Sequence, residues 1–170
     1  NKKESIVNLI TNSRKNLNFM AVNAINRNQL EIASDKFKSG PVTVVQEGLW
    51  QYMTHEENLM ISSHIGELLK SRGGIWITPD IVLKSHFEAA FLSNDYSKKT
   101  RAILTENTER DMVEMAFKSY DEAESLIKST GLSVEKHIQL DLSPNLISSF
   151  DLATHKNLRY PQLWIMRRQK

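Results

Sequence analysis

Residues 42–78 hold two apolar, strand-like runs on either side of a helix whose ends are both marked. The run 42–46 is rich in β-branched residues, which predicts a strand that is covered on both faces. A helix is expected to begin at Thr54, because Glu57 three residues later completes a capping box, and a pair of glycines ends it. The run 75–78 then predicts another buried strand. This strand–helix–strand order favours an α/β fold with parallel strands.

The rest of the chain continues the alternation of helices and strands. The patterns predict helices over 4–13 and 29–37, irregular helices over 83–115, a capped helix over 119–131, a partly helical stretch from about 143, and strands over 17–22, 134–140 and 163–166. We therefore expect a Rossmann-like, doubly wound, mainly parallel sheet with helices on both faces and an antiparallel strand near the C-terminus. Residues 1–170 are expected to form one domain, with 83–116 as a helical insertion or substrate cap.

The composition narrows the function classes. The 22 basic and 20 acidic residues are spread along the chain, so nucleic acid is not the expected partner. The absence of cysteine excludes disulfides, thiolate metal sites and cysteine nucleophiles, and it fits a cytoplasmic protein. No apolar run approaches the roughly 20 residues that a membrane helix needs, so no membrane partner is expected. His55-Glu56 starts like a zinc-protease motif, but Leu59 stands where the second histidine is needed, and no metal site is predicted.

Polar residues follow the predicted strands at the edge where ligands of α/β sheets bind. Glu47 comes directly after the strand 42–46, and its carboxylate there can accept hydrogen bonds from a ligand's ammonium or hydroxyl groups. The alternative is a turn carboxylate bonded to backbone amides. Gly48 allows the backbone to approach a ligand closely. These two residues form the first part of a candidate binding site.

Four further residues are candidates for the same edge. Trp50 and Tyr52 lie two apart in the loop and are expected to wall a substrate pocket, with packing on the core as the alternative. Asn23 ends the strand predicted at 17–22, and its amide can both donate and accept, as a purine requires. Asp80 follows the strand 75–78, where it either faces the pocket or caps a turn.

Residues 41–57 read PVTVVQEGLWQYMTHEE. This segment resembles the family of leucine carboxyl methyltransferases and related polyketide O-methyltransferases, whose hallmark here is Glu-Gly-hydrophobic-x-x-Tyr-hydrophobic-Thr. Residues 73–80, GGIWITPD, look like the family's next strand, and 117–132 look like its late helix. The resemblance covers most of the chain from about Asn18 onward and is most specific around Glu47.

The resemblance implies a class I fold that transfers a methyl group from S-adenosylmethionine, usually to oxygen. By position, Glu47 matches the glutamate that contacts the methionine end of this cofactor. Asn23 and Ala24 match the pair at the adenine, where Asp is the common residue, so Asn23 departs from the pattern. Tyr52 is implied to lie near the methyl-transfer pocket, and the acceptor is a carboxylate or a small-molecule hydroxyl.

The family's glycine-rich cofactor loop, and the acidic residue that grips the ribose, come before every residue matched here. The strands that carry them are expected to be missing from this sequence, so an upstream segment or a homo-oligomer is expected to cover the exposed strand edges. Two functions stay open: an O-methyltransferase dependent on S-adenosylmethionine, or a truncated, non-catalytic interaction module without cofactor. A third alternative is another doubly wound enzyme with Glu-Gly after a strand.

Overall fold

The computed structural model describes residues 2–11, 16–139 and 162–169. The chain divides into two compact units, residues 1–40 and 41–170. That both belong to the single domain expected over residues 1–170 stays a prediction. The helical stretch expected from about 143 lies outside the described residues.

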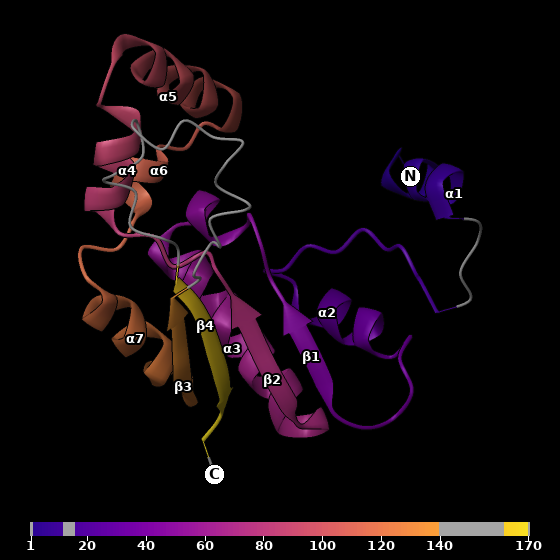
Figure 1. The fold of residues 1–170 in the computed structure, drawn as a ribbon. Coiled ribbons are helices and arrows are strands. Elements are labelled where there is room, and N and C mark those ends of the chain that lie inside the picture. The colour runs from indigo at the N-terminus through magenta and orange to yellow at the C-terminus, as the bar shows by residue number, and fades with distance from the viewer. Residues whose placement is uncertain (1, 12–15, 140–161, 170) are drawn as a thin grey trace. The chain divides into compact units, whose positions relative to one another are not determined.

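The larger unit holds a sheet of four described strands, β1 (Val42–Val45), β2 (Gly74–Thr78), β3 (Leu132–Gln139) and β4 (Gln162–Arg168), in the order β1-β2-β4-β3 (Figure 1). The pair β1–β2 is parallel, whereas β4 runs antiparallel to both β2 and β3. The antiparallel strand near the C-terminus is thus confirmed. Because β4 lies between β2 and β3, only one of these three pairs is parallel, and the expected mainly parallel, doubly wound arrangement is not confirmed.

The helices α3 (His55–Arg72) and α7 (Tyr120–Ser129) pack along the sheet. Gly66 of α3 lies close to Leu132, the Tyr120 ring of α7 lies 5.8 Å from that of Trp164, and the two helices also contact each other. They therefore cover the same face of the sheet, where helices on both faces were expected. Beneath them lie the fully buried residues Trp76, Trp164 and Met166, which belong to the hydrophobic core that stabilises this unit.

Local signals at the helix ends are confirmed. Thr54 and Glu57 form the predicted capping box before α3, and Gly73 ends that helix with a φ of 73°. Ser119 accepts a hydrogen bond from the Glu122 amide at the start of α7. These interactions involve neighbours within a few residues, so the sequence alone indicates them.

The region 83–116 is helical and broken, as predicted, with α4 (Lys84–Phe91), α5 (Asp95–Thr108) and α6 (Met112–Met115). Asn94 caps α5 at the predicted interruption. A small core of Phe87, Met112, Val113 and Ala116 holds α4 to α6. Figure 1 shows this helical segment beyond the carboxyl ends of β1 and β2. Its role as a substrate cap stays a prediction.

The smaller unit contains α1 (Lys2–Thr11) and α2 (Arg27–Ser34). The strand predicted at 17–22 is wrong, because these residues form neither helix nor strand. Leu17, Met20 and Val22 are 43%, 41% and 37% exposed. A strand needs a neighbour for its backbone hydrogen bonds, and no described residue pairs with this run, so its apolar composition does not suffice.

The helix predicted at 29–37 is present but shifted towards the N-terminus, as α2. The Asn26 side chain accepts a hydrogen bond from the Gln29 amide, so the helix starts directly after Asn26. The Asp35 amide donates to the carbonyl of Glu31 as the helix closes. An asparagine cap thus sets the start of α2 earlier than its apolar pattern indicates.

Candidate functional site

The strand-end loop, residues 46–54, joins β1 to α3 at the carboxyl end of the parallel pair β1–β2. The Gln46 amide extends the ladder by donating to the carbonyl of Ile77 at 3.0 Å. Residues that follow β2 therefore lie beside residues that follow β1. The order of the two strands in the sequence predicted that the residues after them lie at the same edge of the sheet.

Asp80 holds the first half of the strand-end loop. This residue is 8% exposed, and its carboxylate accepts hydrogen bonds from the amides of Gly48 at 2.8 Å, Leu49 at 2.8 Å and Trp50 at 3.0 Å. The side-chain amide of Gln46 donates a fourth bond at 3.1 Å. The structure thus brings Asp80, Gly48 and Trp50 together through the backbone, as in the turn alternative, while a contact of Asp80 with substrate stays a prediction.

Glu47 differs from Asp80 in its surroundings. It lies on the same loop, but its side chain is exposed and makes no hydrogen bond or ion pair within the described part of the chain. Gly48 next to it is exposed too and has a φ of 70°, which favours glycine. Of the two carboxylates at this edge, Glu47 is therefore the one with free acceptor oxygens for a ligand.

The two aromatic residues of the loop point into packed surroundings. Trp50 is 2% exposed, and its ring meets that of Trp76 edge-on at 5.4 Å and that of Phe117 at 5.7 Å. It therefore packs on the core, the alternative that the sequence left open. Tyr52 is partly buried against the cluster that contains Phe87. A pocket-lining role for either residue stays a prediction.

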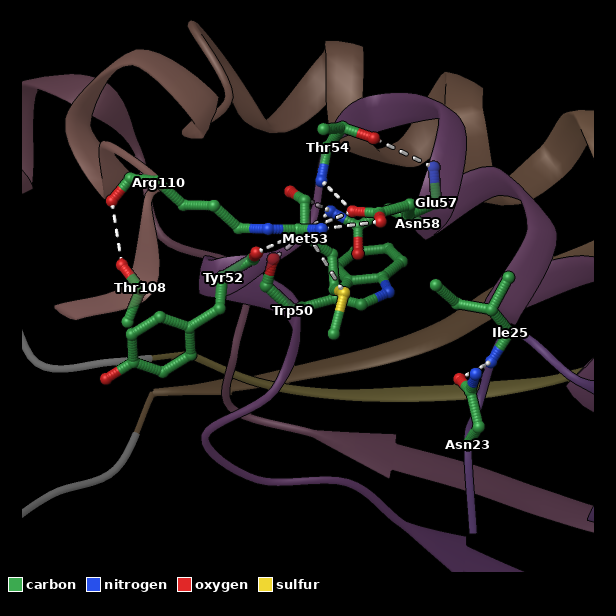
Figure 2. Close-up of polar contacts among 10 residues, drawn as sticks. All are labelled: Asn23, Ile25, Trp50, Tyr52, Met53, Thr54, Glu57, Asn58, Thr108 and Arg110. Atoms are coloured by element: carbon green, nitrogen blue, oxygen red, sulfur yellow. Dashed lines mark hydrogen bonds and ion pairs between the residues drawn. The ribbon is translucent and has the colours of Figure 1, made fainter. Parts of the chain in front are cut away.

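Arg110 holds the second half of the loop, as Figure 2 shows. Its guanidinium donates to the carbonyl of Tyr52 at 2.9 Å and to both carboxylate oxygens of Glu57, one of them at 2.8 Å. The hydrogen bonds from Arg110 lower the pKa of Glu57 from its ordinary value of 4.5 to about 2; the Thr54 amide adds to this effect and burial opposes it. Arg110 follows α5, so this contact fastens the helical segment to the loop.

Asn58 completes the support from inside α3. It is 1% exposed, and its amide nitrogen donates to the carbonyls of Trp50 at 3.2 Å and Met53 at 3.4 Å (Figure 2). Sequence analysis missed both Asn58 and Arg110. An asparagine on the buried face of a helix was an available signal for Asn58, but Arg110 lies 53 residues from Glu57 and no local pattern joins them.

Asn23 and Ala24 belong to the other unit. The Asn23 side chain accepts a hydrogen bond from the Ile25 amide at 3.1 Å, and its backbone amide donates to Gln29 at 2.7 Å. Asn23 is exposed and Ala24 is half-buried. Asn23 thus forms a turn ahead of α2, and contact of the pair with adenine stays a prediction.

Other features of the described residues are less informative. They include no group of three His, Asp or Glu that could hold a metal ion, and no helix among them is long and apolar enough to cross a membrane. A hollow of about 570 Å³ opens beside α5 and is lined by Leu92, Lys98, Arg101, Ala102, Thr105, Glu106 and Asp111. All of these residues lie in the segment 83–116, and none of the individual candidate site residues lines the hollow.

Comparison with known proteins shows that this chain is similar in fold to solved structures. No family model and no curated protein matches the chain. Among solved structures, a DUF574 family protein from Streptomyces avermitilis is similar, with a TM-score of 0.53 and 14% identity over 89% of this chain and 55% of that one. TnmH is similar with a TM-score of 0.47 and 14% identity over 89% of this chain and 35% of that one. The chain thus spans about a third to a half of these proteins, and the likeness to the DUF574 protein is consistent with a Rossmann-like fold.

Proposed function

We propose that this chain is part of an O-methyltransferase dependent on S-adenosylmethionine, and that Glu47 binds the methionine end of the cofactor. One observation carries the proposal. Glu47 presents a carboxylate that has no hydrogen-bond or ion-pair partner among the described residues, on a loop beyond the carboxyl ends of two parallel strands, where α/β sheets bind ligands. The Glu-Gly segment that resembles the methyltransferase family and the Rossmann-like fold both support it.

The chemistry fits the residues available. The ammonium of the methionine moiety is a donor that an exposed carboxylate accepts in a charge-assisted hydrogen bond. The sulfonium makes the methyl group electrophilic when the cofactor is bound, so the protein needs mainly to align an acceptor and exclude water. The acceptor is a carboxylate, or a small-molecule hydroxyl that loses its proton during transfer.

The helical segment 83–116 is proposed to close over the acceptor. It lies beyond the carboxyl ends of β1 and β2, and Arg110 ties it to the carbonyl of Tyr52. Lys84 also donates its amide to the carbonyl of Phe117, which anchors the start of α4. Arg110 thus fixes the later part of the segment beside the strand-end loop, and the bond to Phe117 joins the start of the segment to its end, as a cap over that loop requires.

Calorimetric titration tests the proposal. S-adenosylmethionine and S-adenosylhomocysteine are titrated into the 170-residue chain and into a version extended at its N-terminus, because the family's glycine-rich loop precedes the residues matched here. Binding that Glu47→Gln weakens by about 1–3 kcal/mol is expected, since one charge-assisted hydrogen bond is lost. Glu56→Gln, which changes an exposed carboxylate on α3, is the matched control.

The alternative is a non-catalytic interaction module. Residues 1–40 favour it, because they expose several large apolar side chains, which are typical of surfaces that bind a partner or a second copy: Ile6, Leu9, Ile10, Leu17, Met20, Val22, Ile32 and Phe37. If neither the 170-residue chain nor the extended version binds the cofactor, the methyltransferase proposal is overturned and the interaction module is left. Binding that is unchanged in Glu47→Gln would remove Glu47 from the site.

A further inference from the structure

Three consecutive backbone amides in the strand-end loop converge on one buried carboxylate. The donors are Gly48, Leu49 and Trp50, and the acceptor is Asp80, which comes from the end of the neighbouring strand 30 or more residues away. Successive amides that point at one spot form a concave anion-binding site, usually called a nest. Here the anion belongs to the protein itself.

We propose that Asp80 is a positioning residue that occupies this nest, fixes the backbone of the strand-end loop and thereby sets the direction in which Glu47 is presented. A second consequence is that the nest is closed to anionic ligands. The group bound at this strand end is therefore a cation or a hydrogen-bond donor, recognised by Glu47.

The hydrogen bonding of Asp80 supports the first part. One oxygen accepts from Gly48, and the other accepts from Leu49, Trp50 and the side chain of Gln46. Four bonds to two oxygens leave little acceptor capacity for anything else. Asp80 forms no ion pair within the described residues, and the amide dipoles that surround it there offset the cost of burying its charge.

The side chain of Gln46 is held in place by the same carboxylate. Its nitrogen donates to Asp80, whereas its buried oxygen has no partner among the described residues. A buried acceptor without a partner is costly, so the orientation of Gln46 is held by the bond to Asp80. Gly48 completes the arrangement, because its φ of 70° turns the chain so that its amide joins the other two.

Amide hydrogen exchange measured by NMR on the full 170-residue chain tests the proposal. In Asp80→Ala we expect the amides of Gly48, Leu49 and Trp50 to exchange at least about tenfold faster, because three donors lose their acceptor. Sodium acetate should restore part of the protection by filling the emptied nest, while sodium chloride at the same ionic strength should not. Asp95→Ala is the matched control, since the side chain of Asp95 is 94% exposed.

A second variant keeps the test decisive if Asp80→Ala does not fold. Asp80→Asn retains the size of the side chain but places an NH₂ group among donors, so we expect faster exchange at the same amides and no rescue by acetate. Unchanged exchange at these three amides in a folded variant would overturn the proposal. Faster exchange throughout the sheet without acetate rescue would also overturn it, because Asp80 would then support the core in general.

The inference that Glu47 recognises a cation or a hydrogen-bond donor rests on the proposed function. The inference that Asp80 fixes the backbone of the strand-end loop does not. Glu47→Gln separates them, because it should leave the exchange of Gly48 and Trp50 unchanged and weaken only cofactor binding. Loss of loop protection in Asp80→Ala, together with no cofactor binding by any form, would keep the positioning role and reject the cofactor. Normal cofactor affinity in an Asp80→Ala protein with an unprotected loop would overturn the link between Asp80 and Glu47.

Discussion

The two halves of the strand-end loop are held by different kinds of interaction. Asp80 holds the first half with a buried carboxylate surrounded by neutral donors, and Arg110 holds the second half through an ion pair with Glu57 whose side chains are 33% and 17% exposed. When one partner of a buried hydrogen bond is removed, the other partner stays buried and unpaired, and the folded state carries its full desolvation cost. When one partner of a partly exposed ion pair is removed, water hydrates the other, so the loss of stability is smaller. The first half should therefore depend far more strongly on its anchor than the second.

The largest effect is expected at Asp80. Asp80→Asn should lower the free energy of unfolding by about 3 kcal/mol, because it breaks charge-assisted bonds to a buried carboxylate and leaves amides of the loop without their acceptor oxygen. Urea denaturation followed by tryptophan fluorescence measures this change. The exposed control Asp95→Asn should change stability by less than about 0.5 kcal/mol. If both substitutions lowered stability equally, the burial and hydrogen bonds of the Asp80 carboxylate would not explain the effect of Asp80→Asn.

Asn58 should rank second, because it is buried but neutral. Asn58→Ala removes the donor to the carbonyls of Trp50 and Met53 and should destabilise the protein by about 2 kcal/mol in the same denaturation experiment. Asn107→Ala, at an exposed position of α5, is the control and should be neutral or slightly stabilising. A neutral Asn58→Ala would show that the lost bonds are offset by removal of its buried oxygen, which has no partner in the described part of the chain.

The Arg110 anchor should contribute less. Arg110→Met should destabilise the protein by about 1 kcal/mol, and the coupling to Glu57 in a double-mutant cycle with Glu57→Gln should shrink as salt is added. The effect of Asp80→Asn should hardly change with salt, because its donors are uncharged. A coupling between Arg110 and Glu57 that is insensitive to salt would contradict the assignment of a solvent-screened pair.

The smallest effect concerns pH. Arg110 lowers the pKa of Glu57 to about 2 in the folded chain, from an ordinary value of 4.5. The stabilisation from this shift is therefore fully present above pH 4.5 and is lost as the pH falls towards 2. Partial exposure limits it to about 0.5–1 kcal/mol. The stability difference between the wild type and Glu57→Gln, followed by urea denaturation from pH 5 to pH 2.5, should shrink; a constant difference would contradict the shift.

The candidate site could be predicted in part from the sequence. The strand before Glu47, the capping box at Thr54 and the meeting of the ends of β1 and β2 all follow from local patterns and strand order. The positions of Glu47 and Asp80 at one edge of the sheet follow as well. The sequence did not indicate which of these two carboxylates accepts hydrogen bonds from backbone amides, because both occupy equivalent places after a strand.

The sequence by itself determined the elements that depend on near neighbours, namely the β-branched strand β1, the caps of α3 and α7, and the glycine that ends α3. Only the tertiary structure decided that residues 17–22 are not a strand, that Trp50 packs on Trp76, and that Arg110 reaches Glu57. The physical reason is the range of the interactions. A cap is satisfied within one helical turn, whereas a strand, a core aromatic residue or a buried charge requires partners that only the folded chain brings near.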